Sequence, residues 1–202
     1  MLGFGATGEL AVGELPRRAI GSGINQATLT VSALIVPEQK LQEGILVRST
    51  SAIWVEIASK LGADWSRAGE LTPTQWEEMI AGAYDRAGYK VILTPRSGDG
   101  GRDIIATRAG FGCVKILGSV KAYAPGHLVT AEAVRSLIGV VTADQAASKG
   151  ILTTTSDFAP KIPTDPSIAP FLPTRIQLMN GMELQKWLSE LSAARPLQSS
   201  DG

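Results

Sequence analysis

The clearest pattern of apolar and polar positions in the chain predicts a helix that starts after Thr72. Thr72, Pro73 and Gln75 supply an N-cap, a first-turn proline and the partner residue of a capping box. Gly88 stands where a residue in the left-handed conformation ends a helix. The apolar residues recur three or four positions apart and so lie on one helical face: Trp76, Met79, Ile80, Ala83, Tyr84 and Ala87.

Three other segments show the same helical period over a shorter length. One follows Ser51, one runs over residues 130–141, and the last begins at a capping box formed by Asn180 and Glu183. Each has an apolar face, made by Ile53, Trp54, Ile57, Ala58 and Leu61 in the first, by Val134, Leu137, Ile138 and Val141 in the second, and by Leu184, Trp187, Leu188 and Leu191 in the third. These faces predict three further helices.

Short β-branched and apolar runs between the helices predict strands. They are bounded by Pro, Gly or Asp residues, which end a strand or form a turn. Cys113 is expected to point into the sheet as a small apolar residue. The expected strands cover residues 29–36, ending at Pro37, and residues 89–94, 103–107, 113–123, 150–154 and 176–179.

The order of these elements predicts the fold class. From residue 71 onward it is helix, three strands, helix, two strands and helix. Consecutive strands joined by short turns pair antiparallel, whereas a strand reached through a helix pairs parallel to its predecessor. We therefore expect an α/β domain with a mixed central β-sheet flanked by helices.

The distribution of glycine divides the chain. Residues 1–30 carry six glycines and no sustained period, so we expect a flexible leader there. Residues 31–65 are expected to form a helix-bearing N-terminal extension, residues 66–192 the main domain, and residues 193–202 a disordered tail.

Composition excludes several classes of protein. Hydrophobic residues make up 44% of the chain and charged residues 19%, which favours a packed domain over a disordered chain. The single cysteine cannot form an internal disulfide, and the absence of a CxxC motif excludes the usual structural zinc sites. No apolar stretch approaches the roughly 18 residues of a membrane span, so a soluble, cytoplasmic protein is expected.

Charge gives a local indication of a nucleic-acid partner. The formal net charge is +0, so no global basic field attracts phosphate. Between Arg86 and Lys121, however, seven basic residues stand against two acidic ones, Asp99 and Asp103, a local excess of five. Basic residues in this position would supply the phosphate contacts that dominate DNA affinity.

Asp103, Ser119 and Lys121 are the candidate residues for chemistry. Asp103 follows a glycine-rich turn and opens one expected strand, while Ser119 and Lys121 are two positions apart on the next and so share one face. A carboxylate that binds Mg²⁺ beside a lysine that orients water suits phosphodiester hydrolysis. An Asp–Lys pair across a hairpin is more often a surface ion pair worth under about 1 kcal/mol, so the residue types alone leave both interpretations open.

Five motifs that occur in order along the chain resemble those of a known family. In this order they are similar to the Mrr-like restriction endonucleases, which belong to the PD-(D/E)xK nuclease superfamily. The resemblance covers about residues 71 to 160 and implies a restriction-endonuclease-like core of helix, three antiparallel strands, helix and strand. The motifs are Leu71-Thr72-Pro73-x-x-Trp76-Glu77, Gly88-Tyr89, Ser97-Gly98-Asp99-Gly100-Gly101-Arg102-Asp103, Val120-Lys121-x-Tyr123 and Lys149-Gly150-x-x-Thr153-Thr154-Thr155-Ser156-x-Phe158.

The resemblance also implies roles for individual residues. Asp103 would be the metal-binding aspartate and Lys121 the catalytic lysine of a Mg²⁺-dependent deoxyribonuclease, with Mn²⁺ as the alternative ion, and Glu77 would be an accessory acidic residue. The chain departs from the family at position 119, where Gln or Glu is usual and Ser119 stands instead. A serine hydroxyl is a weak neutral ligand, so Asp103 and Ser119 are expected to hold the metal less firmly than the family's usual pair.

The partner that the resemblance implies is double-stranded DNA, which several members of the family cut when it is methylated. Cleavage of both strands needs two sites, so a homodimer is expected. Contacts with DNA are expected from the basic hairpin and the loop that follows it, through Arg96, Arg102, Lys115, Tyr123 and His127.

Two other functions remain open on the sequence alone. Ser119 and the neutral total charge are compatible with a catalytically degenerate relative that binds DNA or a partner protein without cleavage. The nuclease fold could also serve only as a scaffold for protein interactions, and DNA binding that is absent or independent of salt would favour that function.

Overall fold

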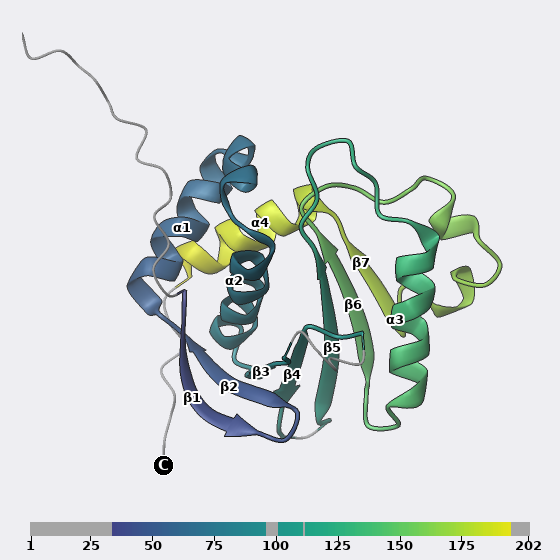
Figure 1. The fold of residues 1–202 in the computed structure, drawn as a ribbon, viewed down its shortest axis with the longest axis horizontal. Coiled ribbons are helices and arrows are strands. Elements are labelled where there is room, and N and C mark those ends of the chain that lie inside the picture. Colours follow the sequence, from purple (N-terminus) through teal and green to yellow (C-terminus); the bar gives the residue numbers. More distant parts are fainter. Residues whose placement is uncertain (1–33, 96–100, 111, 195–202) are drawn as a thin grey trace, which may run out of the picture.

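Seven strands lie side by side in one sheet, in the order in which they occur along the chain (Figure 1). A computed structural model describes residues 34–95, 101–110 and 112–194. The expected leader, residues 1–30, lies outside the described residues, as do residues 195–202 of the expected tail and Asp99 in the glycine-rich turn.

The strands and helices have the following bounds. The strands are β1 (Ile35–Leu41), β2 (Gly44–Ser49), β3 (Lys90–Leu93), β4 (Ile104–Arg108), β5 (Val114–Lys121), β6 (Lys149–Thr154) and β7 (Ile176–Met179). The helices are α1 (Ser51–Ala63), α2 (Pro73–Arg86), α3 (Ala131–Ala143) and α4 (Gly181–Ala193), with short 3-10 turns η1 (Trp65–Glu70), η2 (Ile162–Thr164) and η3 (Ala169–Phe171).

The sheet is mixed, as the order of elements predicts. Strands β1 to β5 pair antiparallel, and β5, β6 and β7 pair parallel. The change of direction follows from the order of elements, since β3, β4 and β5 are separated only by residues 94–103 and 109–113 whereas α3 lies between β5 and β6. The expected α/β class is therefore confirmed.

Helix α2 begins as its sequence predicts. The Thr72 side chain accepts a hydrogen bond from the backbone N–H of Gln75, and the Gln75 side chain accepts one from the N–H of Thr72, which completes the capping box. Gly88 has a φ of 86°, the left-handed conformation expected at the end of the helix. A second capping box, between Asn180 and Glu183, opens α4.

The helices cover the sheet in two layers (Figure 1). Helices α1, α2 and α4 share one buried cluster with one face of the sheet, and α3 shares another cluster with the opposite face. Along β4 and β5 the clusters alternate, because Ile104 and Ile116 belong to the first while Ile105 and Leu117 belong to the second. Every site residue on β5 can therefore be assigned to one face.

Trp54 of α1 joins the extension to the rest of the molecule. Its indole N–H donates a 2.9 Å hydrogen bond to the carbonyl of Met79, and the side chain is 0% exposed. A Cβ atom at Gly82 would lie 2.5 Å from this ring, so only glycine permits the close packing of α1 on α2. Loss of such a buried aromatic side chain typically costs about 3–5 kcal/mol.

The hairpin of β1 and β2 differs from the strand expected at residues 29–36. The described strand begins at Ile35 and continues through Pro37 to Leu41, with a register shift between Pro37 and Gln39. Pro37 is tolerated because β1 is at the edge of the sheet, where an unpaired position needs no backbone N–H. Strand β2 then pairs with β3, so the hairpin extends the same sheet.

Two further observations concern individual expectations. Cys113 precedes β5 and is exposed, so the prediction that it points into the sheet was wrong. It lies outside the pairing of β5 with β4, which includes Val114 but not Cys113. In the ranges that the structure describes, no helix has both the length and the apolar character needed to cross a membrane.

Candidate active site

Asp103 lies at the start of β4, where its backbone is already held by both neighbouring strands. The N–H of Thr94 donates to its carbonyl at 3.0 Å, and its own N–H donates to the carbonyl of Gly118 at 2.9 Å. Its carboxylate turns toward β5, where Oδ2 accepts a 2.6 Å hydrogen bond from the backbone N–H of Val120. One carboxylate oxygen is thus committed to β5, and Oδ1 has no such bond to the described residues.

Ser119 and Lys121 lie near the end of β5, beside the end of β6. The register pairs Ser119 with Leu152 and Lys121 with Thr154. Side chains alternate along a strand, so both share the face of Leu117, which is covered by α3. Ser119 is only 4% exposed, and Lys121 is half-buried. Within the described parts of the chain, Lys121 Nζ forms no hydrogen bond or ion pair and so is available to a ligand.

The structure therefore brings Asp103 and the end of β5 together, as the hairpin predicts. The hydrogen bond from Val120 joins the aspartate to the peptide group that directly precedes Lys121. Asp103 and Val120 are 17 residues apart in the sequence, and the antiparallel pairing of β4 with β5 brings them together. Asp103 and Lys121 thus stand at the same end of two neighbouring strands.

Tyr123 and His127 lie in the loop that leaves β5. Their ring centroids are 4.4 Å apart with an interplanar angle of 43°. His127 is exposed and Tyr123 half-buried, and the neighbouring Leu128 is 40% exposed. This tilted pair of rings follows Lys121 closely along the chain and extends the candidate site toward solvent.

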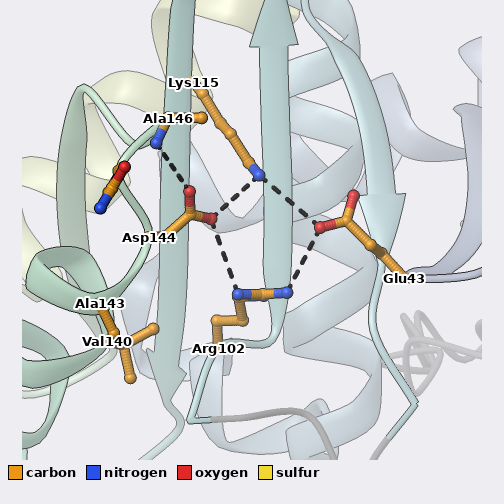
Figure 2. Close-up of a pocket in the computed structure, with 8 residues that line it drawn as sticks. Glu43, Arg102, Lys115, Val140, Ala143, Asp144 and Ala146 are labelled. Carbon is orange, nitrogen blue, oxygen red and sulfur yellow. Dashed lines mark hydrogen bonds and ion pairs between the residues drawn. The ribbon is translucent and has the colours of Figure 1, made fainter.

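Arg102 and Lys115 occupy a different position from Lys121 on the sheet. Lys115 is at the start of β5, and Lys121 is six residues along the same strand, which corresponds to about 20 Å at the rise of a strand. Figure 2 shows both cations between the carboxylates of Glu43 and Asp144, around a cavity of about 550 Å³. Lys115 Nζ is 2.9 Å from Asp144 and 3.6 Å from Glu43, whereas Arg102 is 3.8 Å and 3.4 Å from them.

This four-charge cluster changes the ionisation of Asp144. Burial alone would raise the pKa of Asp144. The hydrogen bond and charge of Lys115, the N–H of Ala146 and the charge of Arg102 together lower it by more, so the pKa lies below its ordinary value. The cluster joins the turn between β1 and β2 to the end of α3. Both cations predicted to bind DNA are therefore already paired with carboxylates.

Other members of the basic segment are also engaged within the protein. The Arg86 guanidinium donates to the carbonyls of Leu191 and Ala194 and lies over the Trp54 ring, and Arg108 lies over the ring of Tyr89. Four of the seven basic residues thus contact protein groups in the described structure, and Arg96 lies outside the described residues. The local charge excess is distributed over both faces of the sheet.

Glu77 and Glu78 are on α2, which packs against the sheet face opposite to that of Ser119 and Lys121. Glu77 is half-buried there. Glu78 was not a predicted site residue, and its pKa is raised because burial disfavours its charge more than the N–H of Leu34 stabilises it. Glu77 therefore belongs to a helix that covers the other face of the sheet from the one that Lys121 shares with Leu117.

The oxygen atoms near Asp103 decide whether a metal ion would fit. The candidate donors are Asp103 Oδ1, which has no bond to the described residues, and the hydroxyl of Ser119 on the neighbouring strand; among the described residues no group of three His, Cys, Asp or Glu side chains could hold an ion. Mg²⁺ in proteins usually keeps several water ligands and is bound by one or two carboxylates together with phosphate oxygens of the substrate. The donor set fits such a partly hydrated ion and does not fit one enclosed by protein ligands.

The family motif at residues 149–158 contains a run of hydroxyl residues. Thr154 and Thr155 stand in this run, at the end of β6. In the structure they bond to backbone groups of Lys121 and Tyr123. The threonine run itself was a visible signal, but its partners are 32 and 33 residues away and depend on the parallel register of β5 and β6.

Comparison with known proteins adds to this geometry. No curated protein matches the chain. Two solved structures are similar: the MspJI restriction endonuclease in complex with a 27-mer oligonucleotide, with 20% identity and a TM-score of 0.43, and the DNA modification-dependent restriction endonuclease AspBHI, with 20% identity and a TM-score of 0.47.

The alignments cover 81% of this chain and 36% of the MspJI chain, and 82% of this chain and 41% of the AspBHI chain. The chain therefore spans well under half of the length of each. A family model described as restriction endonuclease, Mrr_cat, matches residues 68–188, more than half of the chain, and includes Asp103, Ser119 and Lys121. With the motifs in order on the expected mixed sheet, the chain belongs to the Mrr_cat family of restriction endonucleases.

Proposed function

We propose that the protein is a metal-dependent DNA endonuclease that hydrolyses phosphodiester bonds, with Asp103 and Lys121 at its centre. The observation that carries the proposal is the bond from the N–H of Val120 to Asp103, which holds an aspartate next to the peptide that precedes Lys121; the Lys121 amino group has no bond to any of the described residues. Membership of the restriction endonuclease family supports the reaction class.

In this proposal each residue has a distinct part. Asp103 Oδ1, with the hydroxyl of Ser119, would hold Mg²⁺ or Mn²⁺, and the bound ion would supply Lewis-acid polarisation of the phosphate and a more acidic water. Lys121 Nζ donates hydrogen bonds toward the scissile phosphate and stabilises the negative charge that develops there. Glu77 of α2 is the proposed accessory acidic residue.

Double-stranded DNA, including methylated DNA, is the proposed substrate. Tyr123 and His127 would contact it first, because they extend outward directly after Lys121. Arg102 and Lys115, the other proposed contacts, would have to exchange Glu43 and Asp144 for phosphate. Cleavage of both strands would take two copies of the site, so we propose a homodimer on DNA.

A second function is favoured by one specific observation. Ser119, where the family usually has an amide or carboxylate, is 4% exposed and offers only one neutral hydroxyl oxygen. A degenerate member would keep the fold, bind DNA and not cut it.

A plasmid-nicking assay separates these functions. Supercoiled plasmid, methylated or unmethylated, is incubated with the protein and Mg²⁺ or Mn²⁺, and Lys121→Ala is the control variant. The nuclease proposal predicts metal-dependent nicking by the wild type that is lost in the variant. No nicking, together with DNA binding that weakens as salt is raised, would support the degenerate member instead.

A further inference from the structure

The hydroxyl of Thr155 bonds to both polar groups of the Tyr123 backbone. The N–H of Tyr123 donates to Thr155 Oγ1 at 2.8 Å, and Thr155 Oγ1 donates to the carbonyl of Tyr123 at 2.8 Å. A hydroxyl can donate one hydrogen bond while it accepts others, so one side chain satisfies both groups.

Thr154 and the backbone of Thr155 perform the same task for Lys121. Thr154 Oγ1 donates to the carbonyl of Lys121 at 2.8 Å, and the N–H of Thr155 donates to that carbonyl at 3.3 Å. Strand β5 ends at Lys121, so the regular ladder would stop there. Side-chain bonds from the end of β6 instead continue the attachment as far as Tyr123.

The two threonines are themselves firmly held. Thr154 is 0% and Thr155 7% exposed. The indole N–H of Trp65 donates to the carbonyl of Thr155 at 3.3 Å, and a Cβ atom at Gly181 would lie 2.6 Å from that same oxygen. The start of α4 therefore packs directly on the peptide that carries the Thr155 hydroxyl, which gives it little freedom to move.

From these contacts we infer that Thr155, supported by Thr154, is a positioning residue for the segment from Lys121 to Tyr123. It fixes the backbone that carries the lysine and presents the Tyr123–His127 pair on the same side of the site. Thr155 acts through this backbone and touches no substrate. Its effect on cleavage rests on the proposed endonuclease function, whereas its effect on the backbone does not.

The test compares Thr155→Val, which keeps the shape of the side chain and removes the hydroxyl, with Thr155→Ser, which keeps the hydroxyl. Two readouts are measured on the full chain: hydrogen exchange of the Tyr123 amide by NMR, and the single-turnover rate of plasmid nicking at saturating protein. Thr107→Val is the matched control, because the Thr107 hydroxyl also donates to a neighbouring strand, at the carbonyl of Lys90, but near the far end of β4.

We expect Thr155→Val to speed exchange of the Tyr123 amide at least 10-fold and to slow nicking by about 10- to 100-fold, as for other small displacements of catalytic groups. Thr155→Ser should restore both readouts to within a few-fold of the wild type, and Thr107→Val should change neither. The serine variant separates the hydroxyl's hydrogen bonds from a general loss of packing.

Different outcomes overturn different parts. Unchanged exchange at Tyr123 in Thr155→Val would refute the positioning role itself. Faster exchange with unchanged nicking would refute its importance for cleavage. A wild type that never nicks DNA would refute the proposed function and leave the exchange comparison valid. If Thr155→Val does not fold, Thr155→Cys replaces it, since a thiol keeps the volume and is only a weak hydrogen-bonding group.

Discussion

The backbone N–H of Val120 donates a 2.6 Å hydrogen bond to the carboxylate of Asp103. The bond is charge-assisted and short, which makes it stronger than one between neutral groups. Because Val120 directly precedes Lys121, the position of the carboxylate and that of the lysine are set by the same stretch of β5. The aspartate thus has a role in the fold and, in the proposed function, a role in metal binding.

Substitution of Asp103 by asparagine should separate these two roles. An asparagine amide can still accept the N–H of Val120 but carries no charge for a cation, so we expect nicking to fall at least 100-fold while the free energy of unfolding falls by about 1 kcal/mol. Asp103→Ala removes the acceptor as well and should cost about 1–3 kcal/mol. Nicking assays and urea denaturation measure the two effects, and nicking at the wild-type rate by Asp103→Asn would contradict the assignment.

Ser119→Glu should make the stability of the protein depend on divalent metal. The position is 4% exposed, so a carboxylate placed there would be strongly disfavoured in its ionised form without a cation, and folding would favour its protonated form. Bound Mg²⁺ would offset that cost and raise the melting temperature, by the linkage between ligand binding and folding. Differential scanning fluorimetry with Mg²⁺ or with EDTA measures this.

The same variant separates the two candidate functions. A gain of nicking in Ser119→Glu would indicate that the site is decayed and can be restored. Ser119→Gln is the control, because it adds a neutral oxygen of similar reach. A melting temperature of Ser119→Glu that does not respond to Mg²⁺ would place any metal away from this position.

The four-charge cluster should contribute stability that is lost in acid. The pKa of Asp144 is lower in the folded protein than its ordinary value of 3.8, so its contribution is present above pH 3.8 and disappears as the pH falls through the folded value. Asp144→Asn should therefore lower the free energy of unfolding by about 1 kcal/mol at pH 7, less at high salt. Denaturation curves at a series of pH values from 7 downward measure this, and a difference that does not shrink as the pH falls below 3.8 would exclude the ion pairs as its cause.

Glu78→Gln is expected to change stability in the opposite direction. Burial raises the pKa of Glu78 above 4.5, so the ionised form is disfavoured by folding. That cost is absent below pH 4.5 and appears as the pH rises through the folded value. The glutamine variant still offers an oxygen to the N–H of Leu34. Its free energy of unfolding at pH 7 should exceed that of the wild type by about 1 kcal/mol or less, and its melting temperature should be higher. Near pH 4 the two proteins should melt at the same temperature.

Much of the fold was predictable because the relevant signals are local. The capping boxes at Thr72 and Asn180 and the glycine at position 88 specify where helices begin and end, and all three occur in the structure as expected. The hairpin of β1 and β2 was not predictable in the same way. Its strand β1 passes through Pro37 at the sheet edge and exposes most of its side chains, so it lacks both the apolar run and the alternation that indicate a strand.

Candidate-site residues that belong to a family motif were predictable from the sequence. Contacts that depend on how distant strands and helices pair were less so. Asp103 and Lys121 could be taken from the spacing of motifs around a hairpin. The pairing of Lys115 with Asp144 depends on where α3 ends relative to β5, and the contact of Thr155 with Tyr123 depends on a parallel register. Neither relationship leaves a periodic pattern in the sequence.

The packing of Trp54 against Gly82 means that the family match and the unit of cooperative folding have different boundaries. The match begins at residue 68, yet a chain shortened to that point would leave the groove at Gly82 and the carbonyl of Met79 open to water. Residues 34–63 thus complete the core of the matched domain. Any fragment prepared for biochemistry should retain them, since the nuclease core would otherwise be tested in a partly unfolded form.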